Sequence, residues 1–295
     1  MVRIRIPAST ANLGSGFDSI GIALNLYNYV EMELSDSCEI SSADDSEIPT
    51  GEDNLIYVSA KKVFEKAGIP FKGLKIIEKN HIPFARGLGS SSACIAGGIC
   101  GANELLGKPF SKEELLNLAA EIEGHPDNVS PAIMGGFTVN AMDGSSVRFV
   151  KADVPENLIF IAFVPPFELK TADARAVMPK DVSLKDSVFN LSRCGLISAS
   201  FLSGKYENLR LGCEDKLHQP YRLSLIPGGE KIIEKSYEKG ALAAYISGAG
   251  STMAAIFECE KEAAEKIAES ILSAEDFSGW KYFILNADNS GAAAL

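Results

Sequence analysis

A glycine- and serine-rich segment, Gly87–Ser92, constrains the fold most, because it joins a predicted strand to a predicted helix. Residues 74–77 have the character of a short strand, and residues 90–106 are dense in small and apolar side chains that favour a helix packed closely on a sheet. Gly87 and Gly89 permit positive φ, so consecutive N–H groups can curl around an anion at the positive end of the helix dipole. The segment predicts a phosphate site built from backbone donors. The alternative, for this segment alone, is a glycine turn capped by serine.

The charge balance restricts the partners of the chain. Lys and Arg number 28 and Asp and Glu number 39, which gives a formal charge of −11 and a pI near 4.9. This charge argues against nucleic acid or an anionic membrane as a partner. The longest apolar or small-residue stretches, 93–102 and 158–167, are about half of the ~20 residues that span a bilayer, and no targeting segment is recognised. We therefore expect a cytoplasmic protein whose six cysteines are free thiols.

Apolar periodicity predicts strands and helices mixed without strict βαβ alternation, so the expected fold class is α+β. Ser111 and Glu114 have the spacing of a capping box at the start of a helix. The composition changes near residues 151–157, which predicts two domains, 1–155 and 156–295. The other expected elements are strands at 2–6, 30–34, 137–141, 147–150, 158–164, 241–246, 253–257 and 282–285, and helices at 56–67, 186–203, 208–218 and 263–271.

Three other segments accompany the glycine–serine loop. Residues 7–18 follow the first strand, residues 124–128 follow a helix, and residues 246–251 lie between two late strands. In order and spacing, and in the P-x-x-x-G-L-G-S-S-S pattern of residues 83–92, these segments resemble the GHMP small-molecule kinases. The resemblance covers nearly the whole chain. It implies an N-terminal domain like ribosomal protein S5 domain 2 that holds ATP, a ferredoxin-like C-terminal domain, and a substrate in the cleft between them.

Four motifs are most similar to the homoserine kinase branch of that superfamily. They are S-T-A-N-L-G-S-G-F-D at 9–18, H-P-D-N-V at 125–129, T-A-D-A-R at 171–175 and Q-P-Y-R at 219–222. The similarity implies Mg²⁺-dependent transfer of the γ-phosphoryl group of ATP to the hydroxyl of L-homoserine, giving O-phospho-L-homoserine in threonine biosynthesis. Homodimers are common in this branch, so a homodimer is a candidate state here.

The resemblance assigns the two charged ends of the amino-acid substrate to side chains of the chain. Arg175 and Arg222 match carboxylate-binding arginines, and Asp18 matches the partner of the ammonium group. Thr171 and His125 belong to the same substrate-binding motifs. The alternative for each is a structural role: a surface arginine packing its stem, a carboxylate capping a turn, or a histidine that shapes its loop.

Asn12, Asn128 and Asp127 match residues that the family places near the reacting hydroxyl. We treat Asp127 as a site residue and do not assign it as a base, because a loose phosphoryl-transfer transition state needs little early deprotonation. Loop asparagines that bond their own backbone are the alternative for Asn12 and Asn128.

The metal and the nucleotide are assigned in the same way. Glu123, four residues after Ala119, matches the magnesium glutamate of the family, and Ser91 is the expected hydroxyl ligand, with Glu121 and Ser90 as their rivals. The residues expected around ATP are Asn54, Pro83, Phe84, Ala85, Arg86, Gly87, Leu88, Gly89, Ser90, Ser91, Ser92, Ala93, Gly248 and Gly250.

Three other functions fit parts of this pattern. A GHMP kinase acting on a polyol or a mevalonate-type acid would need no partner for an ammonium group, so Asp18 argues against it. A catalytically silent relative would not need both the intact loop Gly87–Ser92 and Glu123. An RNA-binding module like S5 is disfavoured by the acidic pI.

Overall fold

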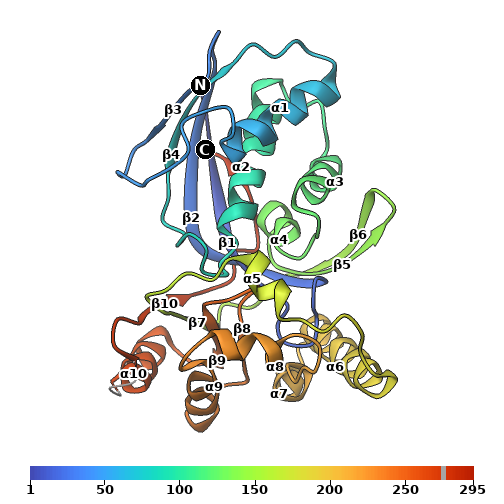
Figure 1. The fold of residues 1–295 in the computed structure, drawn as a ribbon, viewed down its shortest axis with the longest axis vertical. Coiled ribbons are helices and arrows are strands. Elements are labelled where there is room, and N and C mark those ends of the chain that lie inside the picture. Colours follow the sequence, from blue (N-terminus) through green and yellow to red (C-terminus); the bar gives the residue numbers. More distant parts are fainter. Residues whose placement is uncertain (274–276) are drawn as a thin grey trace.

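The computed structural model describes residues 1–273 and 277–295 and contains two β-sheets stacked along the long axis of the molecule (Figure 1). The first sheet has seven strands, whose path β11-β1-β2-β4-β3 is extended by β5 and β6 through β2. All its pairings are antiparallel except that of β3 with β4. These strands are β1 (Val2–Ala11), β2 (Ile20–Leu34), β3 (Glu39–Ser42), β4 (Leu74–Lys79), β5 (Phe137–Asp143), β6 (Ser146–Ala152) and β11 (Ala293–Ala294).

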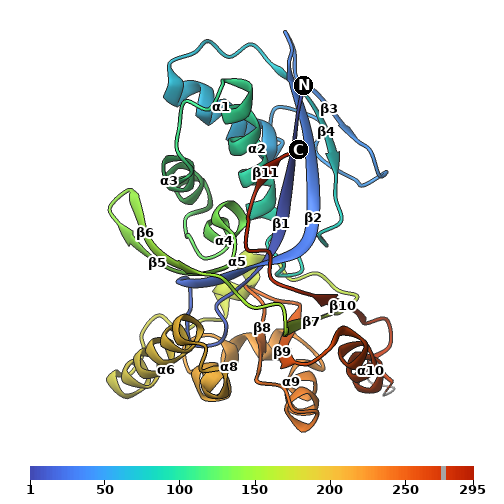
Figure 2. The same cartoon turned by 180° about the vertical axis from the view of Figure 1, so that it is seen from behind.

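Four helices cover one face of the first sheet, as Figure 2 shows from behind. The central helix of the four, α2, packs directly on β1 and β2, and its small residues allow the helix to approach the sheet closely. A Cβ atom at Gly97 would lie 3.0 Å from the Val30 side chain, and one at Gly101 would lie 3.0 Å from Met32. The helices are α1 (Leu55–Ala67), α2 (Ser90–Leu105), α3 (Lys112–Glu123) and α4 (Val129–Met134).

The second sheet is antiparallel and has the strand order β10-β7-β9-β8, which is the order of a ferredoxin-like domain. Every residue of β7 is buried, because both faces of this sheet are covered. Leu158, Phe160 and Ala162 belong to the buried cluster of the first sheet, whereas Ile159 and Ile161 belong to a second cluster that also contains residues of the outer helices α9 and α10. The bounds are β7 (Leu158–Val164), β8 (Ala243–Ile246), β9 (Met253–Glu258), β10 (Lys281–Leu285), α9 (Gly229–Glu238) and α10 (Lys261–Leu272).

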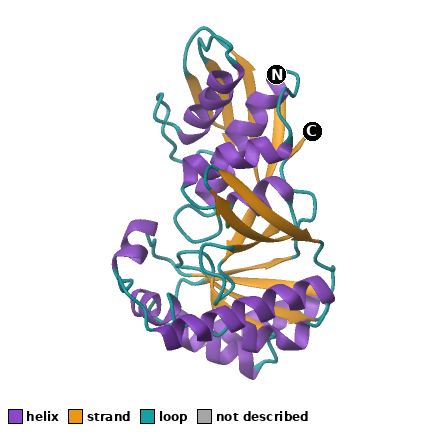
Figure 3. Ribbon diagram, turned by 90° about the vertical axis from the view of Figure 1, so that its right-hand side faces the viewer, coloured by secondary structure: helices purple, strands orange, loops and turns teal. Residues whose placement is uncertain are grey.

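A group of helices flanks the second sheet and reaches back toward the first (Figure 3). The predicted helix 186–203 is present, whereas the predicted helix 208–218 is wrong, because the chain leaves the helical conformation after Gly212. A new turn begins a few residues later, where the Asp215 carboxylate accepts hydrogen bonds from the backbone N–H groups of residues 217, 218 and 219. The elements are α5 (Thr171–Ala176), α6 (Leu184–Ser203), η1 (Tyr206–Asn208), α7 (Leu209–Gly212), α8 (Gln219–Arg222) and η2 (Leu223–Leu225).

The chain crosses between the two sheets more than once. After β10, residues 286–295 return to the first sheet, where Ala293 and Ala294 of β11 pair with Arg5 and Ile4 of β1. The predicted second domain, 156–295, therefore contributes its last strand to the first sheet, and the boundary at residue 155 stays a prediction. Within the described ranges, we find no helix with both the length and the apolarity that a membrane crossing needs.

Candidate active site

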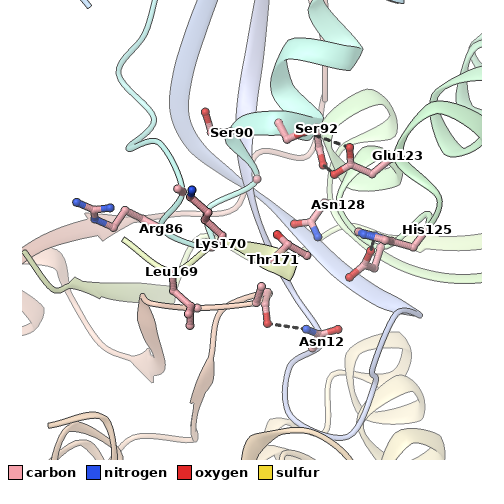
Figure 4. Close-up of a pocket in the computed structure, with 18 of the residues that line it drawn as sticks. Asn12, Arg86, Ser90, Ser92, Glu123, His125, Asn128, Leu169, Lys170 and Thr171 are labelled. Carbon is pink, nitrogen blue, oxygen red and sulfur yellow. Dashed lines mark hydrogen bonds and ion pairs between the residues drawn. The ribbon is translucent and has the colours of Figure 1, made fainter. Parts of the chain in front are cut away.

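One pocket of about 470 Å³ lies between the two sheets and gathers most of the predicted site residues (Figure 4). It is bounded by the loop before α2, the turn after α3, the loop between β1 and β2, α5, α8 and the loop between β8 and β9. The predicted residues that line it are Asn12, Asp18, Phe84, Ala85, Arg86, Gly87, Gly89, Ser90, Ser91, Ser92, Glu123, His125, Asp127, Asn128, Thr171, Arg175, Arg222, Gly248 and Gly250.

Four residues predicted to surround ATP do not line this pocket. Leu88 and Ala93 are buried in the core, and Pro83 also lies outside the lining. Asn54 caps α1: its Oδ1 accepts from the backbone N–H of Ile56, and its Nδ2 donates to Glu78. The residue after Asn54, Leu55, lines the pocket in its place.

The pocket also contains residues that no sequence pattern singled out. Leu169 and Lys170 come from the segment before α5, and Cys94 comes from the first turns of α2. In Figure 4, Lys170 and Thr171 lie between Arg86 and Asn128. Lys170 directly precedes the T-A-D-A-R motif, so its position next to that motif is the only signal that could have identified it.

Two glycines that line the pocket, Gly87 and Gly89, give the loop before α2 its left-handed backbone conformation. Gly87 has φ +77° and Gly89 has φ +73°; a Cβ at Gly87 would overlap the Ser247 carbonyl, and one at Gly89 would overlap the Ser9 hydroxyl. Gly89 is the N-cap of α2, so the helix starts without a side-chain cap for its first N–H groups. Among the described residues, the buried Ser90 hydroxyl also finds no hydrogen-bond partner. Donors of this kind at the positive end of a helix dipole are suited to bind an anion.

Glu123 meets the start of α2 from the last turn of α3 (Figure 4). Its carboxylate accepts hydrogen bonds from the Ser92 hydroxyl at 2.8 Å and from the Ser91 hydroxyl at 3.2 Å. Glu121 is exposed and does not line the pocket. A carboxylate beside hydroxyls at a phosphate-binding helix end is the oxygen-donor set that Mg²⁺ prefers, so these residues fit that ion.

The loop of the second sheet closes one end of the pocket. The Asn12 amide donates to the Gly248 carbonyl at 2.7 Å, and its oxygen accepts from the Asp18 backbone N–H at 2.9 Å. The Ser247 hydroxyl donates to the Gly87 carbonyl at 2.6 Å. Asn12, at φ +71°, therefore connects the β1–β2 loop to the loop between β8 and β9.

His125 and Asp127 form a dyad in the turn between α3 and α4. Nδ1 of His125 lies 2.6 Å from the Asp127 carboxylate, whose side chain is only 3% exposed. Burial alone would lower the His125 pKa, but the hydrogen bond and charge of Asp127 raise it overall. The neighbouring Asn128 accepts from the Ser9 hydroxyl at 2.9 Å, so Asn128 is also fixed by β1.

Arg175 of α5 and Asp18 of the β1–β2 loop form a bidentate ion pair. Nη2 of Arg175 lies 2.9 Å from Oδ1 of Asp18, and Nη1 lies 3.1 Å from Oδ2. The two side chains are 40% and 33% exposed. They carry the charges opposite to those of a carboxylate and an ammonium group, so a zwitterion entering here can exchange partners with both.

Arg222 is the second arginine of the pocket and is far more buried, with 1% of its surface exposed. Its guanidinium lies over the Phe17 ring, 5.1 Å from the centroid. Within the described chain, no carboxylate forms an ion pair with it. Burial first, and then the charge of Arg175, lowers its pKa, and an incoming anion would offset part of the cost of keeping this buried cation charged.

Comparison with known proteins places the chain in a family. The model of the GHMP kinases N terminal domain matches residues 54–136, and that of GHMP kinases C terminal matches residues 197–275. A homoserine kinase from Clostridium beijerinckii is 49% identical over 297 residues, covering 100% of this chain and 99% of that protein. A homoserine kinase from Caldicellulosiruptor bescii is 44% identical, covering 100% and 97%. The crystal structure of homoserine kinase from Cytophaga hutchinsonii superposes with a TM-score of 0.90 at 30% identity, covering 100% and 97%.

Proposed function

The chain belongs to the GHMP kinases, and from this membership we propose that it is a homoserine kinase, which transfers the γ-phosphoryl group of ATP to the hydroxyl of L-homoserine. One observation carries the proposal. Arg175, Arg222 and Asp18 line one pocket together with the glycine–serine loop at the start of α2. A phosphate site and a zwitterion site therefore share a single cavity, as transfer between a nucleotide and an amino acid requires.

We assign the charged ends of homoserine to these three side chains. The carboxylate binds Arg222, which is buried and has no carboxylate partner among the described residues. It also replaces Asp18 as the partner of Arg175. The ammonium group takes Asp18. Ligand atoms of His125 and Asp18 lie within 4.8 Å of each other, and Thr171 begins the helix that carries Arg175, so we assign Thr171 and His125 to the remaining substrate contacts.

The phosphates of ATP are assigned to the N-terminal end of α2, where free N–H groups and the dipole favour negative charge. Mg²⁺ would be held by Glu123 and Ser91 together with phosphate oxygens, and when bound it neutralises charge that develops on the transferred group. Lys170 is a cation in the same pocket and adds to this neutralisation. We retain the adenine-side role of Asn54 as a prediction.

The reacting hydroxyl is assigned to Asn12, Asp127 and Asn128. Hydrogen bonds to Gly248 and Ser9 fix the two asparagines, so they hold the hydroxyl in line with the γ-phosphate by positioning. The Asp127 carboxylate already accepts from His125, and this bond fixes its orientation. Because a loose transition state develops little charge on the attacking oxygen, the hydroxyl proton can leave late, without a committed base.

A substrate panel tests the proposal. ADP release is measured with MgATP and, in turn, L-homoserine, mevalonate and galactose. We expect turnover with homoserine alone, and a product with phosphate on the side-chain oxygen by ³¹P NMR. Turnover with only mevalonate or galactose would show that this compound, and not homoserine, is the substrate. No turnover with any of the three would favour a catalytically silent relative.

The remaining expectations concern the surroundings of the enzyme. We propose a cytoplasmic location, no nucleic-acid or membrane partner and a place in threonine biosynthesis, and we keep the homodimer as a candidate state. Sedimentation of the purified protein tests the last of these directly.

A further inference from the structure

The guanidinium of Arg222 is surrounded by three acceptors from three different elements. Its Nε donates to the Ala174 carbonyl at 3.2 Å, and Nη1 donates to the Gly248 carbonyl at 3.1 Å. The third acceptor is Nδ1 of His218, which lies one turn earlier in the chain and 3.4 Å from the same Nη1. An arginine carries five N–H groups, and these contacts engage the one on Nε and both on Nη1. In the described structure, the two N–H groups of Nη2 make no hydrogen bond and are therefore available to a ligand.

His218 can accept this bond only in one tautomer. Its Nε2 lies 2.8 Å from the Gly14 carbonyl, which only accepts, so the proton belongs on Nε2 and the lone pair on Nδ1 faces Arg222. The ring is fully buried and stacks on Phe17, with centroids 5.2 Å apart. The charged groups that face it are Asp215, with a carboxylate oxygen 3.6 Å from Nε2, Arg222 and, farther away, Asp18. Burial lowers the His218 pKa against the effect of Asp215, which agrees with a neutral ring.

We propose that His218 is a positioning residue, which orients the Arg222 guanidinium toward the substrate carboxylate through the lone pair of Nδ1. This inference rests on the proposed function, because it takes Arg222 as the carboxylate partner. Without Nδ1, one N–H group on Nη1 of this buried cation loses its acceptor. The guanidinium then rotates away from the orientation in which Nη2 faces the substrate carboxylate. His218 itself does not contact the substrate.

His218→Phe removes the acceptor and keeps an aromatic ring on Phe17. We expect the homoserine KM to rise by roughly tenfold or more, the usual effect of losing a hydrogen bond to a charged group, while the KM for ATP stays within twofold. His218→Asn restores an acceptor near the Nδ1 position and should recover most of the affinity. A homoserine KM that stays at the wild-type value in His218→Phe would overturn the proposal.

Gln219→Leu is the matched control for a purely structural effect. Gln219 lies next to His218 in the chain. Its side-chain oxygen accepts from the Ile246 N–H at 2.9 Å and its nitrogen donates to the Cys213 carbonyl at 3.3 Å, and in the described structure its side chain makes no hydrogen bond with Arg222. We expect this variant to lower Tm and leave the homoserine KM unchanged. If it raises that KM as much as His218→Phe does, the role of His218 is structural and the proposal is wrong.

Two further measurements separate this inference from the proposed function. 3-Amino-1-propanol is homoserine without its carboxylate, so its inhibition constant should be equal in wild type and His218→Phe. The ¹⁵N shifts of the His218 ring in the wild-type protein should show the neutral Nε2–H tautomer at pH 7. An imidazolium or an Nδ1–H tautomer would contradict the positioning role even if homoserine proved not to be the substrate. Absence of homoserine turnover in wild type would instead contradict the proposed function.

Discussion

Two glutamates near the end of α3 differ in what they can contact, although they are two residues apart in the chain. Glu123 accepts from the hydroxyls of Ser91 and Ser92, whereas Glu121 is exposed outside the pocket. Glu123→Gln keeps the size and removes the charge, so we expect kcat to fall by roughly 100-fold and the Mg²⁺ requirement to rise. Glu121→Gln is the control, and its activity should stay within twofold. Activity measured as a function of Mg²⁺ concentration tests both variants. Equal losses of activity in the two would show that Glu123 is not a metal ligand.

Asp18 is expected to recognise the ammonium group and no other part of the substrates. Asp18→Asn should raise the homoserine KM by roughly tenfold or more and leave that of ATP unchanged, because an amide does not neutralise a cation. 4-Hydroxybutyrate, which lacks the amino group, provides the control. Its inhibition constant should not worsen in the variant, and a parallel loss of homoserine and 4-hydroxybutyrate binding would indicate general damage to the pocket.

The His125–Asp127 dyad predicts a pH-dependent contribution to stability. The folded-state pKa of His125 is raised above its unfolded value by Asp127, despite burial, so the charged pair stabilises the fold below the unfolded pKa. This stabilisation is lost as pH rises through the folded pKa. Urea unfolding of wild type and His125→Gln should therefore differ most near pH 5.5 and least near pH 8.5. A difference that grows with pH would contradict the assignment of the dyad.

At the scale of the elements, the start of α2 depends on a backbone shape that only glycine fits. Gly89 and Gly107 have nearly the same φ, +73° and +77°, but a Cβ at Gly89 would overlap the Ser9 hydroxyl, whereas Gly107 faces open space. Gly89→Ala should therefore abolish measurable ATP binding in calorimetry. Gly107→Ala should cost only about 1 kcal/mol of stability and keep ATP affinity. Equal effects of both would mean that left-handed geometry alone, and not close approach, matters at Gly89.

Elements with strong local signals could be predicted from the sequence. The capping box of α3 is confirmed, because the Ser111 hydroxyl accepts from the Glu114 N–H and the Glu114 carboxylate accepts from the Ser111 N–H. The unbroken apolar run of β7 is also confirmed as a buried strand. The helix α9 was missed although Ile232, Ile233 and Tyr237 recur at helical spacing among charged residues, which is typical of an amphipathic helix, and they pack in the second cluster. The turn that follows the break at Gly212 is held by the Asp215 carboxylate, which accepts from the backbone N–H groups of residues 217–219, and apolar periodicity does not encode such contacts.

Motifs predicted the candidate site better than they predicted its internal contacts. Asn12, Glu123 and Arg222 lie far apart in the sequence, and only their motifs indicated that they would meet. Lys170 has no motif of its own and was missed. The pairing of Asp18 with Arg175 could not be predicted either, because it depends on how the segment from the second sheet folds over the β1–β2 loop.

At the scale of the whole molecule, the formal charge of −11 does not describe the pocket. The lining has four basic side chains, from Arg86, Lys170, Arg175 and Arg222, and three acidic ones, from Asp18, Glu123 and Asp127. Backbone donors at the start of α2 add partial positive charge without any change in net charge. The positive charge that would attract an anion is thus arranged locally, and most acidic residues of the chain lie elsewhere.

The two sheets share one core, and this predicts cooperative unfolding. Leu158, Phe160 and Ala162 of β7 belong to the same buried cluster as Ile4 and Ile6 of β1, so the second sheet cannot lose its inner face without exposing the first. Thermal unfolding should therefore follow a single transition in far-UV circular dichroism, which reports on both sheets.

The single tryptophan makes this prediction testable on one sheet alone. Trp280 lies beside β10 and packs edge-on against Phe277, 5.7 Å between ring centroids, so its fluorescence reports on the second sheet. The midpoint of thermal unfolding measured by this fluorescence should coincide with the midpoint measured by circular dichroism. Phe160→Ala opens a cavity in the shared core and should destabilise the protein by about 3–5 kcal/mol, shifting both midpoints together. Two separate midpoints, or a shift in fluorescence alone, would show that the second sheet unfolds independently of the first.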